Sequence, residues 1–134
     1  MTKKNILTTL QNYWLSCAWA GVIAFLSLTA GSNLPKLDWD LLSPDKFGHF
    51  TVYGLLCFLL LRDYTKSNFK DKVVLLTYSS TWFASTVFGF LMEWSQYLFT
   101  PDRCFEYPDM LANALGAALG AVVFYWSNRL KKMK

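Results

Sequence analysis

The sequence predicts an all-α protein, an integral membrane bundle of four transmembrane helices that run up and down. Of its 134 residues, 54% are hydrophobic and 18% aromatic, while only 16% are charged. That balance is rich in apolar residues for a small soluble domain. The apolar residues also gather in four stretches near the length of roughly 20 residues that a helix needs to cross a bilayer. We expect one domain over residues 1–134, with spans at about 13–31, 45–61, 73–99 and 109–127.

The first stretch, residues 13–31, carries no charged side chain and follows the basic residues Lys3 and Lys4. A basic start before an apolar run is also typical of a signal peptide. The length of the stretch, and the lack of a clear small-x-small cleavage site after Leu28, favour a retained helix. Because it holds serine and threonine but nothing ionisable, we expect this helix to serve as scaffold.

The second stretch reaches spanning length only when it is extended back to Asp45, with Pro44 at a helix start. Asp45, His49 and Tyr53 then recur at intervals of four, which places them on one helix face. The macrodipole at a helix N-terminus favours a carboxylate and disfavours an imidazolium, so His49 is a candidate proton acceptor. A histidine that only hydrogen-bonds to a neighbour explains the position equally well.

The third stretch bears Ser85, Gly89 and Glu93 on one stripe, with Gln96 a turn further on. Small and hydroxyl side chains on one face are typical of close helix contacts in membranes, so we expect this face to look inward. Glu93 would lie about 9 Å from the helix end at Phe99 by the helical rise, below the surface and short of the midplane. It serves either as a functional acid or as a buried carboxyl that fixes helix pairing.

The fourth stretch begins with a helix-start residue, Pro108, and Asp109 and Asn113 then share a face one turn apart. Gly116 and Gly120 follow as GxxxG, a motif of close helix contact in apolar segments. Packing within the chain and homo-oligomerisation through these glycines are both open. In either case the glycine face presses Asp109 and Asn113 toward another helix.

The distribution of basic residues predicts which side each helix end faces. Ten of the 13 lysines and arginines lie at the two termini or between spans two and three, where we place Arg62 and Asp63 in an inner loop. Both termini are therefore expected to be cytoplasmic, and the short loops predict antiparallel neighbours. The net charge of +4 suits contact with anionic membrane lipids, and no nucleic acid is predicted as a partner.

Polar and ionisable side chains gather near the outer, extracytoplasmic ends of spans two to four. Such residues are expensive in lipid and mark functional sites. The candidate ligand-binding residues are Asp45, Lys46, His49, Tyr53, Glu93, Gln96, Arg103, Asp109 and Asn113. The planar fork of Arg103 suits a phosphate or carboxylate, and it suits pairing with Glu93 or Asp109 equally well. His49 and Glu93 are the catalytic candidates.

One histidine among carboxylates is a thin ligand set for a metal. The set of His49, Glu93, Asp109 and Cys104 lacks the tight HxxxH or CxxC spacing of zinc sites. The sequence therefore predicts no metal and no cofactor. A channel or transporter is also disfavoured for a monomer, because polar groups at one end leave the inner half of the bundle apolar.

The polar positions combine into one pattern over most of the chain. Its elements are Asp45-Lys46-Phe47-Gly48-His49-Phe50, Tyr53-Gly54, Glu93, Gln96, Arg103, Asp109, Asn113 and Gly116. Their order and spacing resemble the VanZ-like family of small bacterial membrane proteins, from about Leu34 to the end of the fourth span. The chain departs from the family pattern between Cys104 and Pro108, where many members have a serine or a glycine-rich turn. Some members are linked to lowered susceptibility to teicoplanin, a lipoglycopeptide that acts outside the cytoplasmic membrane, so the resemblance implies an envelope-related role.

Two classes of function follow from these observations. In the first, the outer pocket binds an amphipathic ligand, such as a lipid-linked cell-wall precursor, a lipid headgroup or a lipoglycopeptide such as teicoplanin, and in the last case lowers glycopeptide susceptibility. In the second, the protein is an integral membrane enzyme acting on lipid or peptidoglycan intermediates, with Glu93 and His49 as an acid–base pair. The second class requires two titrating groups within hydrogen-bond reach, which the spacing permits but does not demonstrate.

Overall fold

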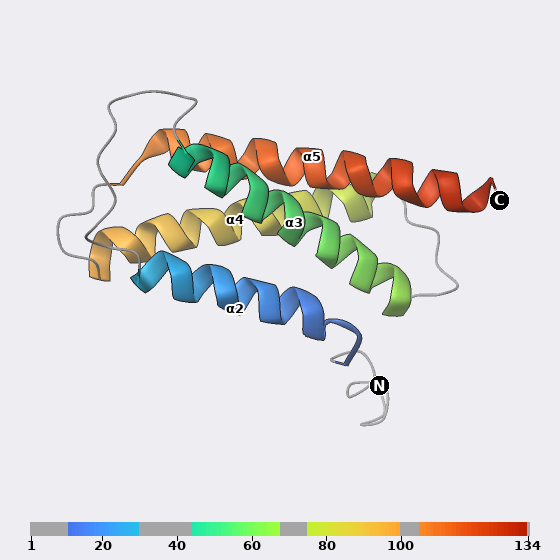
Figure 1. Ribbon diagram of the computed structural model, residues 1–134, viewed down its shortest axis with the longest axis horizontal. Helices are drawn as coiled ribbons and strands as arrows, with labels where there is room; N and C mark the ends of the chain where they lie inside the picture. The colour runs from blue at the N-terminus through green and yellow to red at the C-terminus, as the bar shows by residue number, and fades with distance from the viewer. Residues whose placement is uncertain (1–10, 30–43, 68–74, 100–104, 134) are drawn as a thin grey trace.

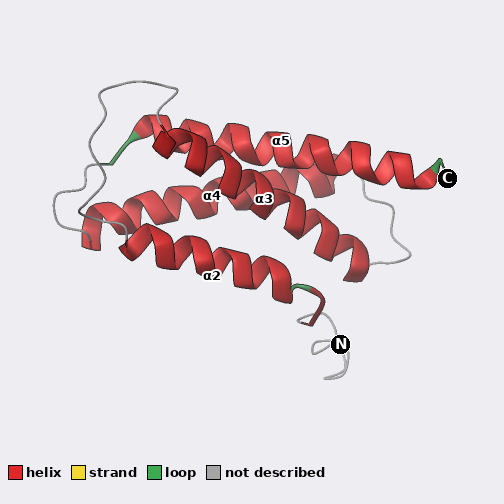
Figure 2. Ribbon diagram, viewed as in Figure 1, coloured by secondary structure: helices red, strands yellow, loops and turns green. Residues whose placement is uncertain are grey.

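The computed structural model describes residues 11–29, 44–67, 75–99 and 105–133. This part of the chain forms four long α-helices and no strand (Figures 1 and 2). The helices are α2 (Trp14–Thr29), α3 (Pro44–Ser67), α4 (Leu75–Phe99) and α5 (Tyr107–Lys132). The prediction of an all-α fold is confirmed.

The second helix continues well beyond the predicted end of its span at residue 61. The segment from Arg62 to Ser67 is the last part of α3, so the prediction that Arg62 and Asp63 lie in a loop was wrong. Asp63 is fully buried, because it faces the start of α2. The polar side chains ended the apolar pattern without ending the helix, since Arg and Lys are good helix formers.

Helices that follow one another in the chain run antiparallel, and α3 and α5 therefore run parallel (Figure 1). α3 and α5 form the most extensive helix contact, while α4 packs against both. α2 lies against α3 and α4. The starts of α3 and α5 and the end of α4 consequently lie at the same end of the molecule.

Two glycines bring the backbones of α3 and α5 into direct contact. A Cβ at Gly116 would overlap the carbonyl oxygen of Phe50, and one at Gly120 would overlap the carbonyl oxygen of Gly54. A Cβ at Gly54 would in turn lie 2.9 Å from the Gly116 oxygen. This packing gives the GxxxG motif a role within one chain, and the homo-oligomer suggested by the same motif stays a prediction.

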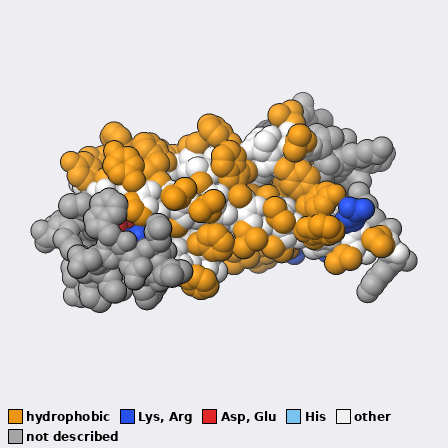
Figure 3. All heavy atoms as spheres, turned by 90° about the horizontal axis from the view of Figure 1, so that it is seen from above, with side chains coloured by type: hydrophobic (Ala, Val, Ile, Leu, Met, Phe, Trp, Pro, Cys, Tyr) orange, Lys and Arg blue, Asp and Glu red, His pale blue; other side chains and the backbone are white. Residues whose placement is uncertain are grey.

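Large apolar side chains are exposed on all four helices, and Figure 3 shows hydrophobic side chains over much of the face turned to the viewer, between the two ends. Phe25 on α2, Phe83 on α4 and Trp126 on α5 are each more than half exposed. By length and composition, one helix among the described residues is able to cross a membrane, Tyr107–Lys131, and Trp14–Thr29 is apolar but shorter. The four-span arrangement and the cytoplasmic placement of both termini therefore stay predictions.

Candidate functional site

One end of the bundle holds a group of polar side chains from three helices. We call this group the polar cluster and define it as Asp45, Lys46, His49, Tyr53, Glu93, Glu106, Asp109 and Asn113. Most of its members are buried or nearly so. It lies where α3 and α5 begin and α4 approaches its end.

The starts of α3 and α5 bring carboxylates to this end of the molecule. Asp45 lies in the first turn of α3, and Asp109 lies in the first turn of α5, just after Pro108. A proline at the start of a helix loses no hydrogen bond, because the first N–H groups have no partner within the helix. Because the two helices are parallel, their positive dipole ends converge on both carboxylates and stabilise their negative charge.

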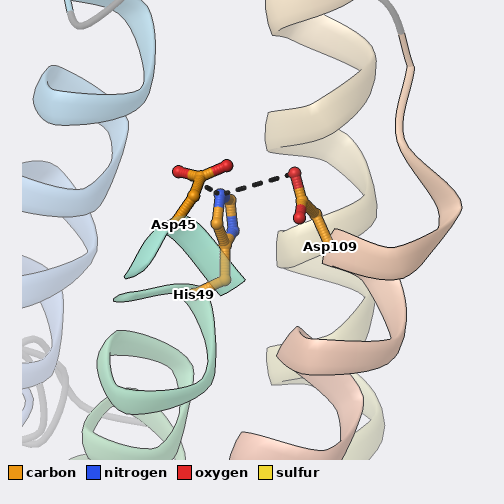
Figure 4. A group of neighbouring side chains, drawn as sticks. All are labelled: Asp45, His49 and Asp109. Atoms are coloured by element: carbon orange, nitrogen blue, oxygen red, sulfur yellow. Dashed lines mark ion pairs between the residues drawn. The ribbon is translucent and has the colours of Figure 1, made fainter. Parts of the chain in front are cut away.

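His49 lies at the centre of the polar cluster and contacts acceptors through both ring nitrogens. Its Nδ1 is 3.1 Å from Asn113 Oδ1 and 3.7 Å from Glu93 Oε1. Its Nε2 is 3.9 Å from Asp109 Oδ2 and 4.0 Å from Asp45 Oδ1. Figure 4 shows the ring between the carboxylates of Asp45 and Asp109. The imidazole therefore links all three helices of the cluster.

Lys46 supplies positive charge to the polar cluster. Its Nζ lies 3.4 Å from Asp109 Oδ1 and 3.5 Å from Glu106 Oε2. The Lys46 side chain is only 9% exposed, so this ammonium is held between the two carboxylates rather than in solvent. Lys46 therefore engages one oxygen of Asp109, while the other oxygen faces His49.

Two buried hydrogen-bond donors in the polar cluster find no hydrogen-bond partner among the described residues. They are the Tyr53 hydroxyl and the Asn113 Nδ2, and both residues are at most 1% exposed. The Tyr53 ring stacks on His49 with the ring centres 6.3 Å apart. Asn113 packs against Gly89, where a Cβ would lie 2.8 Å from Nδ2. A glycine at position 89 therefore makes room for the Asn113 amide.

Seven of the nine candidate residues from the sequence meet in this cluster: Asp45, Lys46, His49, Tyr53, Glu93, Asp109 and Asn113. Gln96 does not join them, because its Nε2 donates to the carbonyl oxygen of Ser27 and ties α4 to α2. Arg103 lies outside the described residues. Sequence analysis did not select Glu106, although its position just before Pro108 places it at the start of α5.

The fold and the polar cluster define a class of small helical proteins with a buried, carboxylate-rich polar site at one end. A family model described as VanZ/LLP1 matches residues 5–128, so the chain belongs to that family. The match confirms the resemblance and extends it to the first helix. Comparisons with curated proteins and with solved structures found no match.

Proposed function

We propose that this protein is a multi-pass protein of the cytoplasmic membrane, and that its polar cluster binds the polar part of an envelope-related amphipathic ligand on the extracytoplasmic side. The candidate ligands are a lipid-linked cell-wall precursor, a lipid headgroup and a lipoglycopeptide such as teicoplanin. The observation that carries the proposal is the pair of buried donors on Tyr53 and Asn113 that have no hydrogen-bond partner among the described residues. The proposed single domain covers the whole chain.

A membrane location is supported by the exposed apolar side chains on every described helix. Burying such surface is worth about 25 cal/mol per Å², and a lipid bilayer covers it without a protein partner. The basic residues at the end of α5 and the termini support the proposed orientation, because positive charge collects on the cytoplasmic side. The polar cluster lies at the opposite end of α3 and α5.

Binding of a polar ligand group is supported by the buried donors of the polar cluster that have no hydrogen-bond partner among the described residues. A buried donor without a partner costs about 1 to 3 kcal/mol, so such donors are rare and call for an explanation. The Tyr53 hydroxyl and the Asn113 amide nitrogen are both donors, and a ligand hydroxyl, carbonyl or phosphate oxygen would satisfy them. The neighbouring carboxylates would accept hydrogen bonds from ligand hydroxyls or amines.

The test is ligand retention by the purified protein. Native mass spectrometry of detergent-solubilised protein should detect a co-purified phospholipid or lipid-linked precursor. Tyr53→Phe and Asn113→Ala should each reduce its occupancy at least threefold, because each removes one donor from the cluster. The matched control is Gln96→Leu, which changes a buried polar residue directed toward α2 and should retain the ligand.

Teicoplanin provides a separate arm of the same test. Addition of teicoplanin should raise the melting temperature of the wild-type protein and not that of Tyr53→Phe. Equal retention of lipid in all variants, together with no thermal shift by teicoplanin, would contradict the proposed binding function.

Catalysis is a second candidate function, favoured by the 3.7 Å separation of His49 Nδ1 and Glu93 Oε1. Two titrating groups at this distance are able to exchange a proton, and such contacts commonly tighten when substrate binds. In this proposal Glu93 and His49 act as an acid–base pair on a lipid or peptidoglycan intermediate. Turnover of a lipid-linked substrate should then disappear in Glu93→Gln, and turnover that survives this change would remove Glu93 from the mechanism.

A further inference from the structure

The side of His49 that carries Nε2 faces two carboxylates from different helices. Asp45 lies one turn before His49 on α3, and Asp109 reaches the ring from α5 (Figure 4). One ligand atom from each of the three residues lies within 4.8 Å of the others. Asp45 was absent from the ligand set considered in the sequence, and its addition supplies a second carboxylate on this side of the ring.

The other side of the ring holds the imidazole in one protonation pattern. Asn113 Oδ1 is an acceptor 3.1 Å from Nδ1, and Glu93 Oε1 lies 3.7 Å from the same nitrogen. These acceptors lie closer to Nδ1 than the carboxylates of Asp45 and Asp109 lie to Nε2. The shorter distances favour the tautomer with the proton on Nδ1, which leaves a lone pair on Nε2. Metal-binding histidines are commonly oriented in this way, with the second ring nitrogen donating to a carbonyl or carboxylate.

The burial of the Asn113 amide adds to the case for this orientation. The residue is fully buried, and its Nδ2 has no hydrogen-bond partner among the described residues. The amide therefore directs its oxygen to His49 although its nitrogen is left unsatisfied. An asparagine held in this state is explained if its oxygen is needed to orient the imidazole.

Charge in the polar cluster is also unbalanced among the described residues. Even without Glu93, the three carboxylates of Asp45, Glu106 and Asp109 face one lysine among the described residues, Lys46. Lys46 contacts Oδ1 of Asp109, whereas Oδ2 faces His49. Buried charges are normally paired or bound to a metal, so a cation between Nε2 and the two carboxylates would offset the excess negative charge.

We propose that Asp45, His49 and Asp109 form a binding site for a divalent transition metal, with His49 Nε2 and one oxygen of each carboxylate as ligands. Mixed imidazole and carboxylate ligands suit Zn²⁺ and Mn²⁺. Bonds of roughly 2.0 to 2.2 Å place two ligands of a tetrahedral ion about 3.4 Å apart. The observed separations are 3.9 and 4.0 Å from Nε2 to the two carboxylates and up to 4.8 Å among the three ligand atoms. Binding therefore needs side-chain movements of about half an ångström to about 1.4 Å.

Such a site goes beyond the proposed function, because binding of a cation does not require an amphipathic ligand. Three protein ligands leave coordination positions for water or for an oxygen of another molecule. Asn113 and Glu93 act as positioning residues, since they contact the imidazole rather than the metal.

The experiment measures metal binding by the full chain in detergent after treatment with a chelator. Calorimetric titration with Mn²⁺ and with Zn²⁺ should give one site per chain, and pulsed electron paramagnetic resonance of the Mn²⁺ complex should show coupling to one imidazole nitrogen. His49→Ala should abolish the nitrogen coupling, and Asp109→Asn should weaken binding at least 100-fold. Asn113→Leu should weaken binding by about 10- to 100-fold through loss of ring orientation.

Glu106→Gln is the matched control, because it removes a carboxylate of the same cluster that is outside the ligand set. Its affinity for Mn²⁺ should stay within threefold of the wild type, and circular dichroism should show equal helix content in all variants. Absence of one-site binding in the wild type would overturn the metal site. Equal weakening in Glu106→Gln and Asp109→Asn would overturn it as well, because it would indicate diffuse attraction to negative charge.

The experiments distinguish failure of the metal site from failure of the proposed function. Lipid retention without metal binding would overturn the metal site and leave the proposed function standing. Metal binding without retention of lipid or teicoplanin would support the metal site and contradict the proposed function.

Discussion

Two buried groups of polar side chains lie toward opposite ends of α3, and they differ in how completely their hydrogen bonds are formed. Toward the C-terminal end of α3, Asp63 Oδ2 accepts from the backbone N–H of Ser16 at 3.1 Å and from its hydroxyl at 2.6 Å. The other Asp63 oxygen lies 3.4 Å from Arg62 Nη1. At the N-terminal end, His49 meets carboxylates at 3.7 to 4.0 Å. The donors of Tyr53 and Asn113 have no partner within the part of the chain that the structure describes.

The Asp63 contact is explained by helix physics alone. The first N–H groups of α2 lack partners within the helix, and a carboxylate near a helix N-terminus is favoured by the macrodipole. Asp63 therefore caps α2 from another helix and docks the two together. In the polar cluster, the distances from His49 to the carboxylates are longer, and the donors of Tyr53 and Asn113 have no partner among the described residues. Complete hydrogen bonding suits a structural role for Asp63, and the incomplete hydrogen bonding of the polar cluster is the basis of our proposal that it binds a ligand.

The largest expected effect is on stability, at Asp63. Asp63→Ala removes two hydrogen bonds to a charged acceptor at about 1.5 kcal/mol each, so the free energy of unfolding should fall by about 3 kcal/mol. Thermal or denaturant unfolding in one detergent measures this change. Asp63→Asn keeps an acceptor oxygen for Ser16 and should lose about half as much. A loss below 1 kcal/mol in Asp63→Ala would remove the distinction between the two ends.

The next largest effect on stability is expected at the contact between the backbones of α3 and α5. Gly120→Ala places a methyl group on the Gly54 carbonyl oxygen, and overpacking of this kind destabilises by about 1 to 3 kcal/mol. Gly21→Ala is the control, because a Cβ at Gly21 meets nothing within 4 Å. It should stabilise by about 0.5 to 1 kcal/mol through helix propensity. Equal melting temperatures for the two variants would show that the close approach is not required.

A smaller effect on stability is expected at Gln96, which lies on the same helix as Glu93 but hydrogen-bonds to α2. Gln96→Leu removes the hydrogen bond to the Ser27 carbonyl and should lower the free energy of unfolding by about 1 kcal/mol. Ser95→Ala is the control, since its hydroxyl bonds only to Leu91 within α4. Loss of ligand binding in Gln96→Leu with unchanged stability would instead assign Gln96 to the binding site.

The smallest change in stability is expected within the polar cluster itself. Asp109→Asn and Glu93→Gln keep side-chain shape and reduce repulsion among neighbouring carboxylates, so in the presence of a chelator both should melt at or above the wild type. Residues of functional sites commonly lower the stability of a protein. Replacing them should therefore raise the free energy of unfolding by about 0.5 kcal/mol, at the low end for such substitutions. Melting well below the wild type would mean that the cluster mainly joins the helices, as Asp63 does.

Spacing along each helix was enough to predict which side chains share a face. Asp45 and Tyr53 do lie beside His49 on α3, and His49 meets Asp109 and Asn113 on α5, because a period of 3.6 residues fixes angular position within a helix. The same reasoning could not assign Gln96 to α2, since two residues on neighbouring turns of α4 differ in direction enough to face different partners. It also missed Asp63, because a charged residue after an apolar run is indistinguishable in sequence from the start of a loop.

By itself, the sequence determined the all-α class, the polar faces and the family of this protein, since these depend on composition, periodicity and motif order. Only the tertiary structure decided that α3 and α5 lie together in parallel, that Lys46 is held between Asp109 and Glu106, and that Asp45 and Asp109 flank the His49 ring. Helical periodicity places a side chain relative to its own axis, but not relative to another helix. That relation is set by packing between helices, here by the glycines that let two backbones touch.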